Sequence, residues 1–198
     1  MTLPKYDKSK RRKGFEQLPK GAYVIKILNV KEEPRRYEEG RQLTISFDIA
    51  EGEYKDFYAG QYRANSNEDK TWPYDAVYNL KIPNDNDKEY IWSDWNSFFS
   101  DLEDSNNRFV FDSVHVDDLK GKVIGGKFHI WQQEKNGNIY DHTKLRWTCV
   151  ADDVRNGTAG QMPKDKLITS FGSRPETPET PVGTFVNFDP EKEGLPFA

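Results

Sequence analysis

The chain has 198 residues and a formal net charge of −4, with 33 Asp and Glu against 29 Lys and Arg. This length suits one domain with a hydrophobic core and tails. A mean hydropathy of −0.92, and no apolar run of about 18 residues, exclude a membrane-spanning helix. The single cysteine, Cys149, excludes an internal disulfide, and the first residues lack an apolar secretion signal. We therefore expect a cytoplasmic protein with no membrane partner.

Charge is distributed unevenly along the chain. Residues 1–13 hold six cations and one carboxylate for a net +5, and residues 173–198 hold two cations and five carboxylates for −3. The part between them therefore carries −6. An acidic central part argues against a generic basic nucleic-acid-binding domain. We interpret residues 1–14 as a flexible, disordered basic arm.

Three strands are predicted at the start of the folded part. Residues 22–30 are dense in β-branched and aromatic side chains and lie between Gly21 and Pro34. Residues 42–49 alternate strictly between apolar and polar side chains, as a half-buried strand does. A third strand, with weaker alternation, is predicted over residues 56–63.

One helix is predicted to follow these strands. Apolar side chains recur there at steps of three and four residues: Trp92, Trp95, Phe98, Phe99 and Leu102. Ser93 is a suitable N-cap, and Asp94 would lie in the first turn. The sequence therefore predicts an amphipathic helix in this region.

The last two predicted strands form a hairpin. Residues 122–133 and 139–151 have strand character, and Asn136-Gly137 between them is a strong hairpin signal. The predicted order is three strands, a helix and two strands, as in a five-stranded oligonucleotide-binding (OB) barrel. In that fold the loops that join strands 1 and 2 and strands 4 and 5 flank the ligand face. We therefore predict a mainly β, five-stranded OB-fold domain over residues 15–170, with one amphipathic helix between strands 3 and 4.

The C-terminal residues 171–198 have the composition of a disordered linker and an acidic tail. Pro175, Pro178 and Pro181 recur every three residues, and such a segment cannot bury enough apolar surface to fold. The chain then ends in apolar anchors with acidic flanks, which suit a basic pocket on a partner protein. The predicted partner-binding residues are Asp189, Glu191, Glu193, Leu195, Pro196 and Phe197. A disordered end without a role is the alternative.

Several short segments follow one another in a distinctive order: residues 15–24, 46–55, Trp92, 98–99, 103–106 and 119–122. Because of these segments and their order, residues 15–155 resemble the single-stranded-DNA-binding (SSB-like) proteins that phages of Gram-positive bacteria encode near their recombination and replication genes. The resemblance implies an OB fold and sequence-independent binding and protection of single-stranded DNA inside the bacterial host cell, during phage DNA replication or DNA recombination.

The ending also resembles that of bacterial single-stranded DNA-binding proteins. Their acidic tails finish in an aliphatic residue, proline and a terminal phenylalanine, and here Leu195, Pro196 and Phe197 follow an acidic stretch. The resemblance implies recruitment of replication or recombination proteins by this tail. Ala198 departs from the pattern, because it moves the terminal carboxylate one residue beyond the ring. Docking that needs ring and carboxylate together would be weakened.

Single-strand binders combine aromatic rings that stack on bases with cations that follow the phosphates. Alternation along the fourth strand places Lys127, His129 and Trp131 on an exposed face, although Trp131 fits a core position equally well. On the fifth strand, alternation predicts Trp147 in the core. The predicted DNA-binding residues are Arg35, Arg36, Tyr37, Arg41, Lys127, Trp131, Lys144 and Arg146. Weaker candidates are Tyr58, Tyr62, Trp72 and Tyr74.

Motifs for catalysis or metal binding are missing from the sequence. The three histidines show no metal-ligand spacing with Cys149, and neither a phosphate-binding loop nor a Gly-x-Ser-x-Gly motif is present. We therefore predict a protein that is not an enzyme and needs no cofactor or metal. Homo-oligomerisation stays open. The alternative function is a protein–protein adaptor on the same OB scaffold, which the acidic central part favours.

Overall fold

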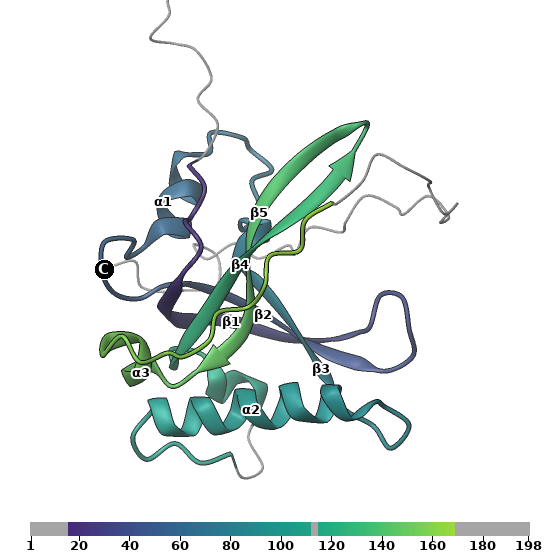
Figure 1. The fold of residues 1–198 in the computed structure, drawn as a ribbon, viewed down its shortest axis with the longest axis vertical. Coiled ribbons are helices and arrows are strands. Elements are labelled where there is room, and N and C mark those ends of the chain that lie inside the picture. The colour runs from purple at the N-terminus through teal and green to yellow at the C-terminus, as the bar shows by residue number, and fades with distance from the viewer. Residues whose placement is uncertain (1–15, 112–114, 169–198) are drawn as a thin grey trace, which may run out of the picture.

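The computed structural model describes residues 16–111 and 115–168 (Figure 1). Five strands form one antiparallel sheet in the order β3-β2-β1-β4-β5. Their bounds are β1 Ala22–Pro34, β2 Arg41–Ile49, β3 Val77–Ile82, β4 Val123–Lys135 and β5 Asn138–Cys149. The predicted basic arm and acidic tail, including the six residues of the tail assigned to partner binding, lie outside the described residues.

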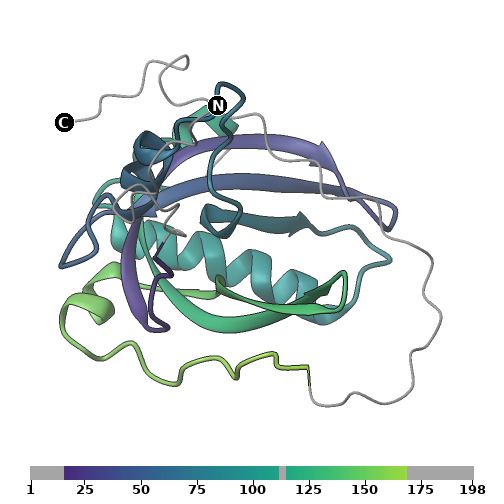
Figure 2. The ribbon, with the colours of Figure 1, turned by 90° about the horizontal axis from the view of Figure 1, so that it is seen from above.

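The described residues form five helical segments: α1 Phe57–Ala64, the 3-10 turn η2 Tyr74–Ala76, α2 Glu89–Ser105, the 3-10 turn η3 Val116–Leu119 and α3 Ala151–Arg155. The longest, α2, packs against β3, β4 and β5, and Figures 1 and 2 show it running along one side of the sheet. None of the described helices combines the length and apolar character needed to cross a membrane. The predicted mainly β fold, with five strands and a helix between β3 and β4, is confirmed.

The strand predicted over residues 56–63 is wrong, because this segment is helix α1. Tyr58, Ala59 and Tyr62 are buried at helical spacing. The buried carboxylate of Asp48 accepts hydrogen bonds from the backbone N–H groups of Tyr58 and Ala59, both at 2.9 Å, which satisfies the first turn. The third strand is instead β3, further along the chain.

Helix α2 begins earlier than predicted. Its N-cap is Lys88 rather than Ser93, so Asp94 lies beyond the first turn. Ile91 is buried and extends the apolar face of the helix toward its N-terminus. The apolar spacing located the helix, and the capping signal misplaced its start.

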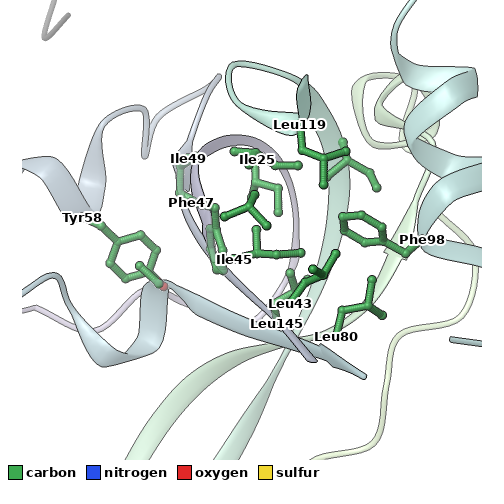
Figure 3. Close-up of a cluster of buried hydrophobic side chains, with 14 of the residues drawn as sticks. Ile25, Leu43, Ile45, Phe47, Ile49, Tyr58, Leu80, Phe98, Leu119 and Leu145 are labelled. Atoms are coloured by element: carbon green, nitrogen blue, oxygen red, sulfur yellow. The ribbon is translucent and has the colours of Figure 1, made fainter. Parts of the chain in front are cut away.

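The core lies between the sheet and α2 and continues to α1. Figure 3 shows side chains of β1, β2 and β3 meeting Phe98 of α2, with Tyr58 on the far side of the cluster. A register shift between Ile27 and Asn29 in β1 marks a bulge, which bends a strand locally. Strand β1 can therefore pair with both β2 and β4.

The last described residues lie beside β4. The backbone N–H of Gln132 donates to the Lys166 carbonyl at 2.9 Å, and the Lys166 N–H donates to the Ile130 carbonyl at 2.8 Å. This contact forms a parallel bridge between Trp131 and Lys166. Figure 1 shows the segment, in yellow-green, following the β4–β5 hairpin. The segment therefore places Lys166, which follows the hairpin in the sequence, beside Trp131.

Candidate nucleic-acid interface

Three aromatic rings from different parts of the chain form a cluster, the aromatic patch, made of Tyr74, Trp131 and His142. The centroids of Tyr74 and Trp131 lie 6.4 Å apart, and His142 lies 5.7 Å from each. Tyr74 comes from η2, Trp131 from β4 and His142 from β5. Tyr74 is about half exposed and Trp131 partly exposed, so the patch presents ring surface to solvent.

Two lysines flank the aromatic patch. Lys144 Nζ lies 3.1 Å from the centroid of the Tyr74 ring, and Lys166 Nζ lies 6.0 Å from that of Trp131. Both satisfy the distance of a cation–π contact. The patch therefore combines the two elements of a single-strand binding surface, stacking rings and cations.

A shared carboxylate organises the base of the patch. Asp75 Oδ1 accepts from His142 Nδ1 at 2.9 Å and lies 3.3 Å from Lys144 Nζ. Lys144 also donates to the backbone carbonyl of Tyr74. Burial lowers the pKa of Lys144 to about 8, although Asp75 acts in the opposite direction. Lys144 therefore loses its charge nearer neutral pH than an exposed lysine does.

The β1–β2 loop brings Arg36 and Tyr37 toward the patch. The Tyr37 ring is 70% exposed, and Arg36 Cζ lies 6.0 Å from its centroid. Burial is the main cause that raises the pKa of the Tyr74 hydroxyl, and the negative charge of Asp75 raises it further. The positive charge of Arg36 lowers this pKa. The same loop that the sequence singled out therefore acts electrostatically on Tyr74.

Arg35, predicted to bind DNA, is buried. It donates to both carboxylate oxygens of Asp87, at 2.8 and 2.6 Å, and to the Ile82 carbonyl at 2.6 Å. Gly40 closes the loop at φ +113°, where an added Cβ would lie 3.0 Å from the Arg35 guanidinium carbon. Arg35 therefore fastens the β1–β2 loop to the segment after β3. Arg41 is exposed and pairs with Glu32 at 2.8 Å.

The prediction that Trp147 is a core residue is wrong, because its side chain is 38% exposed. Lys127 pairs with Trp147 and Phe128 pairs with Leu145, which leaves Arg146 outside the ladder as the extra residue of a bulge. An extra residue breaks the alternation that the sequence pattern assumes. Arg146 is exposed and lies 3.7 Å from Asp94 of α2.

The predicted exposed face of β4 is only partly exposed. His129 is buried, since its Nδ1 hydrogen-bonds with the Lys164 carbonyl at 2.8 Å. Lys127 and Trp131 are both half-buried, and Lys127 lies away from the patch, near Asp101 and Gly160. Segment 164–168 covers this face, and its position could not be read from the alternation of β4.

The structure groups some predicted residues and separates others. Trp131 belongs to the patch, Lys144 flanks it, and Arg36 and Tyr37 approach it. Arg35, Lys127 and Arg146 lie elsewhere. Sequence reasoning missed His142 and Lys166, and ranked Tyr74 low. His142 stands two residues before Lys144 on β5, a spacing that could have indicated a shared face. Lys166 gave no such signal.

Comparison with known proteins assigns no family. No protein-family model matches the sequence, and no curated protein matches it. Among the described residues, no group of three or more His, Cys, Asp or Glu side chains could hold a metal ion. We therefore infer function from the aromatic patch and its neighbouring charges.

Proposed function

We propose that this protein binds single-stranded DNA without sequence preference through the aromatic patch. The observation that carries the proposal is the grouping of Tyr74, Trp131 and His142 with Lys144 and Lys166 around them. Every base has a face that can stack on such rings, so binding of this kind tolerates any sequence. Arg36 and Tyr37 extend the surface toward the β1–β2 loop.

We further propose that the sheet is an OB-type barrel. The strand order β3-β2-β1-β4-β5 and a helix between β3 and β4 support this interpretation. The two edge strands, β3 and β5, contact each other, as the closing strands of such a barrel do. The aromatic patch then lies near the 1–2 loop, one of the two loops that flank the ligand face in OB folds.

The charges of the protein limit how tightly it can hold the phosphates. The part between residues 13 and 173 has 27 Asp and Glu against 21 Lys and Arg, a net −6, so its carboxylates oppose the phosphates of a bound strand. Each phosphate contact contributes a salt slope of about −0.7 on single strands. We expect a shallow salt dependence and an affinity that depends mainly on stacking.

The acidic C-terminal residues complete the proposal. The anchors Leu195, Pro196 and Phe197 among carboxylates suit a basic pocket on replication or recombination proteins of a bacterial host. The DNA-binding and partner-binding roles then lie on different parts of the chain. Phe197→Ala should abolish partner capture and leave DNA binding unchanged.

Two tryptophan substitutions test DNA binding. Trp131→Ala should weaken binding to labelled oligo-dT by roughly 1–3 kcal/mol, the value of one stacked base. Trp92→Ala is the matched control, because Trp92 is 40% exposed on α2, away from the patch. Fluorescence anisotropy measures both. Equal affinity of the two variants would overturn the proposed interface, and no binding by the native protein would overturn the function.

A second candidate, the protein–protein adaptor, is favoured by one surface near α2. Trp92, Val110 and Phe111 are exposed there, and the Phe111 ring stacks on Phe99 with centroids 3.7 Å apart. Neighbouring apolar side chains of this kind are typical of protein-binding surfaces. Loss of partner capture in Trp92→Ala, without any DNA binding by the native protein, would support the adaptor.

A further inference from the structure

A cleft of about 380 Å³ adjoins the aromatic patch. Its walls come from residues 16–18, α1, the segment around η2, and β5. Tyr74, Asp75 and His142 belong to both the patch and the cleft. The volume falls within the range of about 300–1,000 Å³ typical of small-molecule sites. A group held on the patch therefore lies at the mouth of a site large enough to receive it.

The cleft wall contains a buried polar atom without a partner. Tyr58 lines the cleft and is 2% exposed, and its hydroxyl has no hydrogen-bond partner among the described residues. An unmet buried polar group is unfavourable, and such groups are rare in native proteins. Burial raises the pKa of this hydroxyl well above its usual value, so it remains a protonated donor. Tyr58 therefore lacks an acceptor.

Asp75 supplies an acceptor in the same wall. Its contacts with His142 and Lys144 both involve Oδ1, and no described group donates to Oδ2. The cleft thus offers a hydroxyl donor and a carboxylate acceptor. Aromatic rings of Phe57, Tyr62 and Tyr140 line the remaining surface. Such walls suit a flat ring with both donor and acceptor groups.

We propose that the cleft receives one base of the bound single strand, with its hydrogen-bonding edge toward Tyr58 and Asp75. This inference rests on the proposed function. Enzymes that extrude a base read it by stacking and by bonds to its Watson–Crick edge, and each base has an acceptor beside an N–H donor there. The Tyr58 oxygen is shielded from solvent, so the lining side chains must shift slightly to admit the base. The Asp75 carboxylate repels a phosphate from the same place.

The hydroxyl of Tyr58 can be removed alone. Tyr58→Phe should weaken oligo-dT binding roughly three- to tenfold, the value of one hydrogen bond, with an unchanged salt slope. Its urea midpoint should not fall, because the lost hydroxyl has no hydrogen-bond partner among the described residues. Tyr23→Phe is the control, since Tyr23 lies outside the cleft lining and its hydroxyl donates to the Pro19 carbonyl at 2.8 Å.

A second variant fills the cleft. Thr71 lines it, and Thr71→Trp should weaken oligo-dT binding at least as much as Tyr58→Phe does. In the native protein, a short oligo-dT should shift the backbone NMR signals of Gln61 and Thr143, which also line the cleft.

The outcomes separate the two proposals. Binding lost in Trp131→Ala but unchanged in Tyr58→Phe and Thr71→Trp would overturn the base site and leave the proposed function standing. A lower urea midpoint for Tyr58→Phe with native affinity would assign the hydroxyl a structural role and also overturn it. Absence of DNA binding by the native protein would overturn both.

Discussion

Arg35 and Lys144, two cations that the sequence assigns to one DNA-binding surface, lie in different surroundings. The Arg35 side chain is 2% exposed and donates to both oxygens of Asp87 and to three backbone carbonyls. Lys144 shares the Asp75 carboxylate with His142 and lies over the Tyr74 ring. The N–H groups of Arg35 therefore donate to acceptors within the protein. Lys144 borders a partly exposed aromatic surface.

The role of each cation therefore depends on the groups that surround it. An arginine fork that matches a carboxylate in two places is rigidly held, and here it shapes a loop. The Lys144 side chain is 13% exposed, and we expect it to reach a phosphate only by leaving the Asp75 carboxylate. Charge and position in the sequence, an arginine in a loop and a lysine on a predicted strand, do not reveal this difference.

The largest expected effect follows from breaking the Arg35 pair. Arg35→Met should lower the free energy of unfolding by about 3 kcal/mol, because it removes the donor that neutralises Asp87 and that bonds to three backbone carbonyls. Urea denaturation followed by tryptophan fluorescence measures this loss. DNA affinity per folded molecule should change little. A loss of affinity with native stability would place Arg35 at the DNA.

Lys144 should make DNA affinity depend on pH. Its pKa, lowered by burial to about 8 from 10.5, means that its charge fades between pH 7 and 9, so DNA affinity should fall over this interval. Stability should change in the opposite sense, because between pH 8 and 10.5 the unfolded chain holds the proton that the folded protein has released. Anisotropy and urea titrations at several pH values test both trends. Lys144→Met should remove the pH dependence of binding.

A smaller change is expected in salt dependence. Lys166→Gln should reduce the slope of log affinity against log salt by about 0.7, the loss of one phosphate contact. Arg146→Gln should leave the slope unchanged, since Arg146 lies near Asp94 of α2 and outside the patch. The reverse result would move the phosphate path from the patch to the α2 side of β5.

Arg41→Gln should have the smallest effect. Its side chain is 67% exposed, and its pair with Glu32 is a surface ion pair. Such pairs contribute about 0–1 kcal/mol, so the unfolding free energy should change by no more than about 0.5 kcal/mol. A stability loss comparable to that of Arg35→Met would show that the two loop arginines act together.

Local patterns predicted the elements that carry a regular apolar period or a turn signal. The strict alternation of residues 42–49 predicted β2 within one residue of its bounds, but the expected half-buried strand is wrong, because Thr44, Ser46 and Asp48 on its polar face are buried as well. Asn136 and Gly137 adopt φ values of +54° and +74°, as a two-residue hairpin turn requires, and β4 and β5 pair as predicted. Apolar side chains at helical spacing predicted α2, because the face that they form packs on the sheet.

Tertiary contacts decided what these patterns left ambiguous. Residues 57–64 form a helix whose first-turn N–H groups donate to Asp48 of the preceding strand, a contact that the weak alternation of this segment does not reveal. The bulge at Arg146 turns Trp147 outward. The apolar and polar pattern of the sequence does not show where a strand contains such an extra residue. The aromatic patch joins η2, β4 and β5, and Lys166 reaches it by pairing beside β4. By itself the sequence determined β1, β2, the β4–β5 hairpin, the central part of α2 and the residue types of a candidate site. Only the packing of distant segments decided which side chains meet, because that depends on register and pairing between strands.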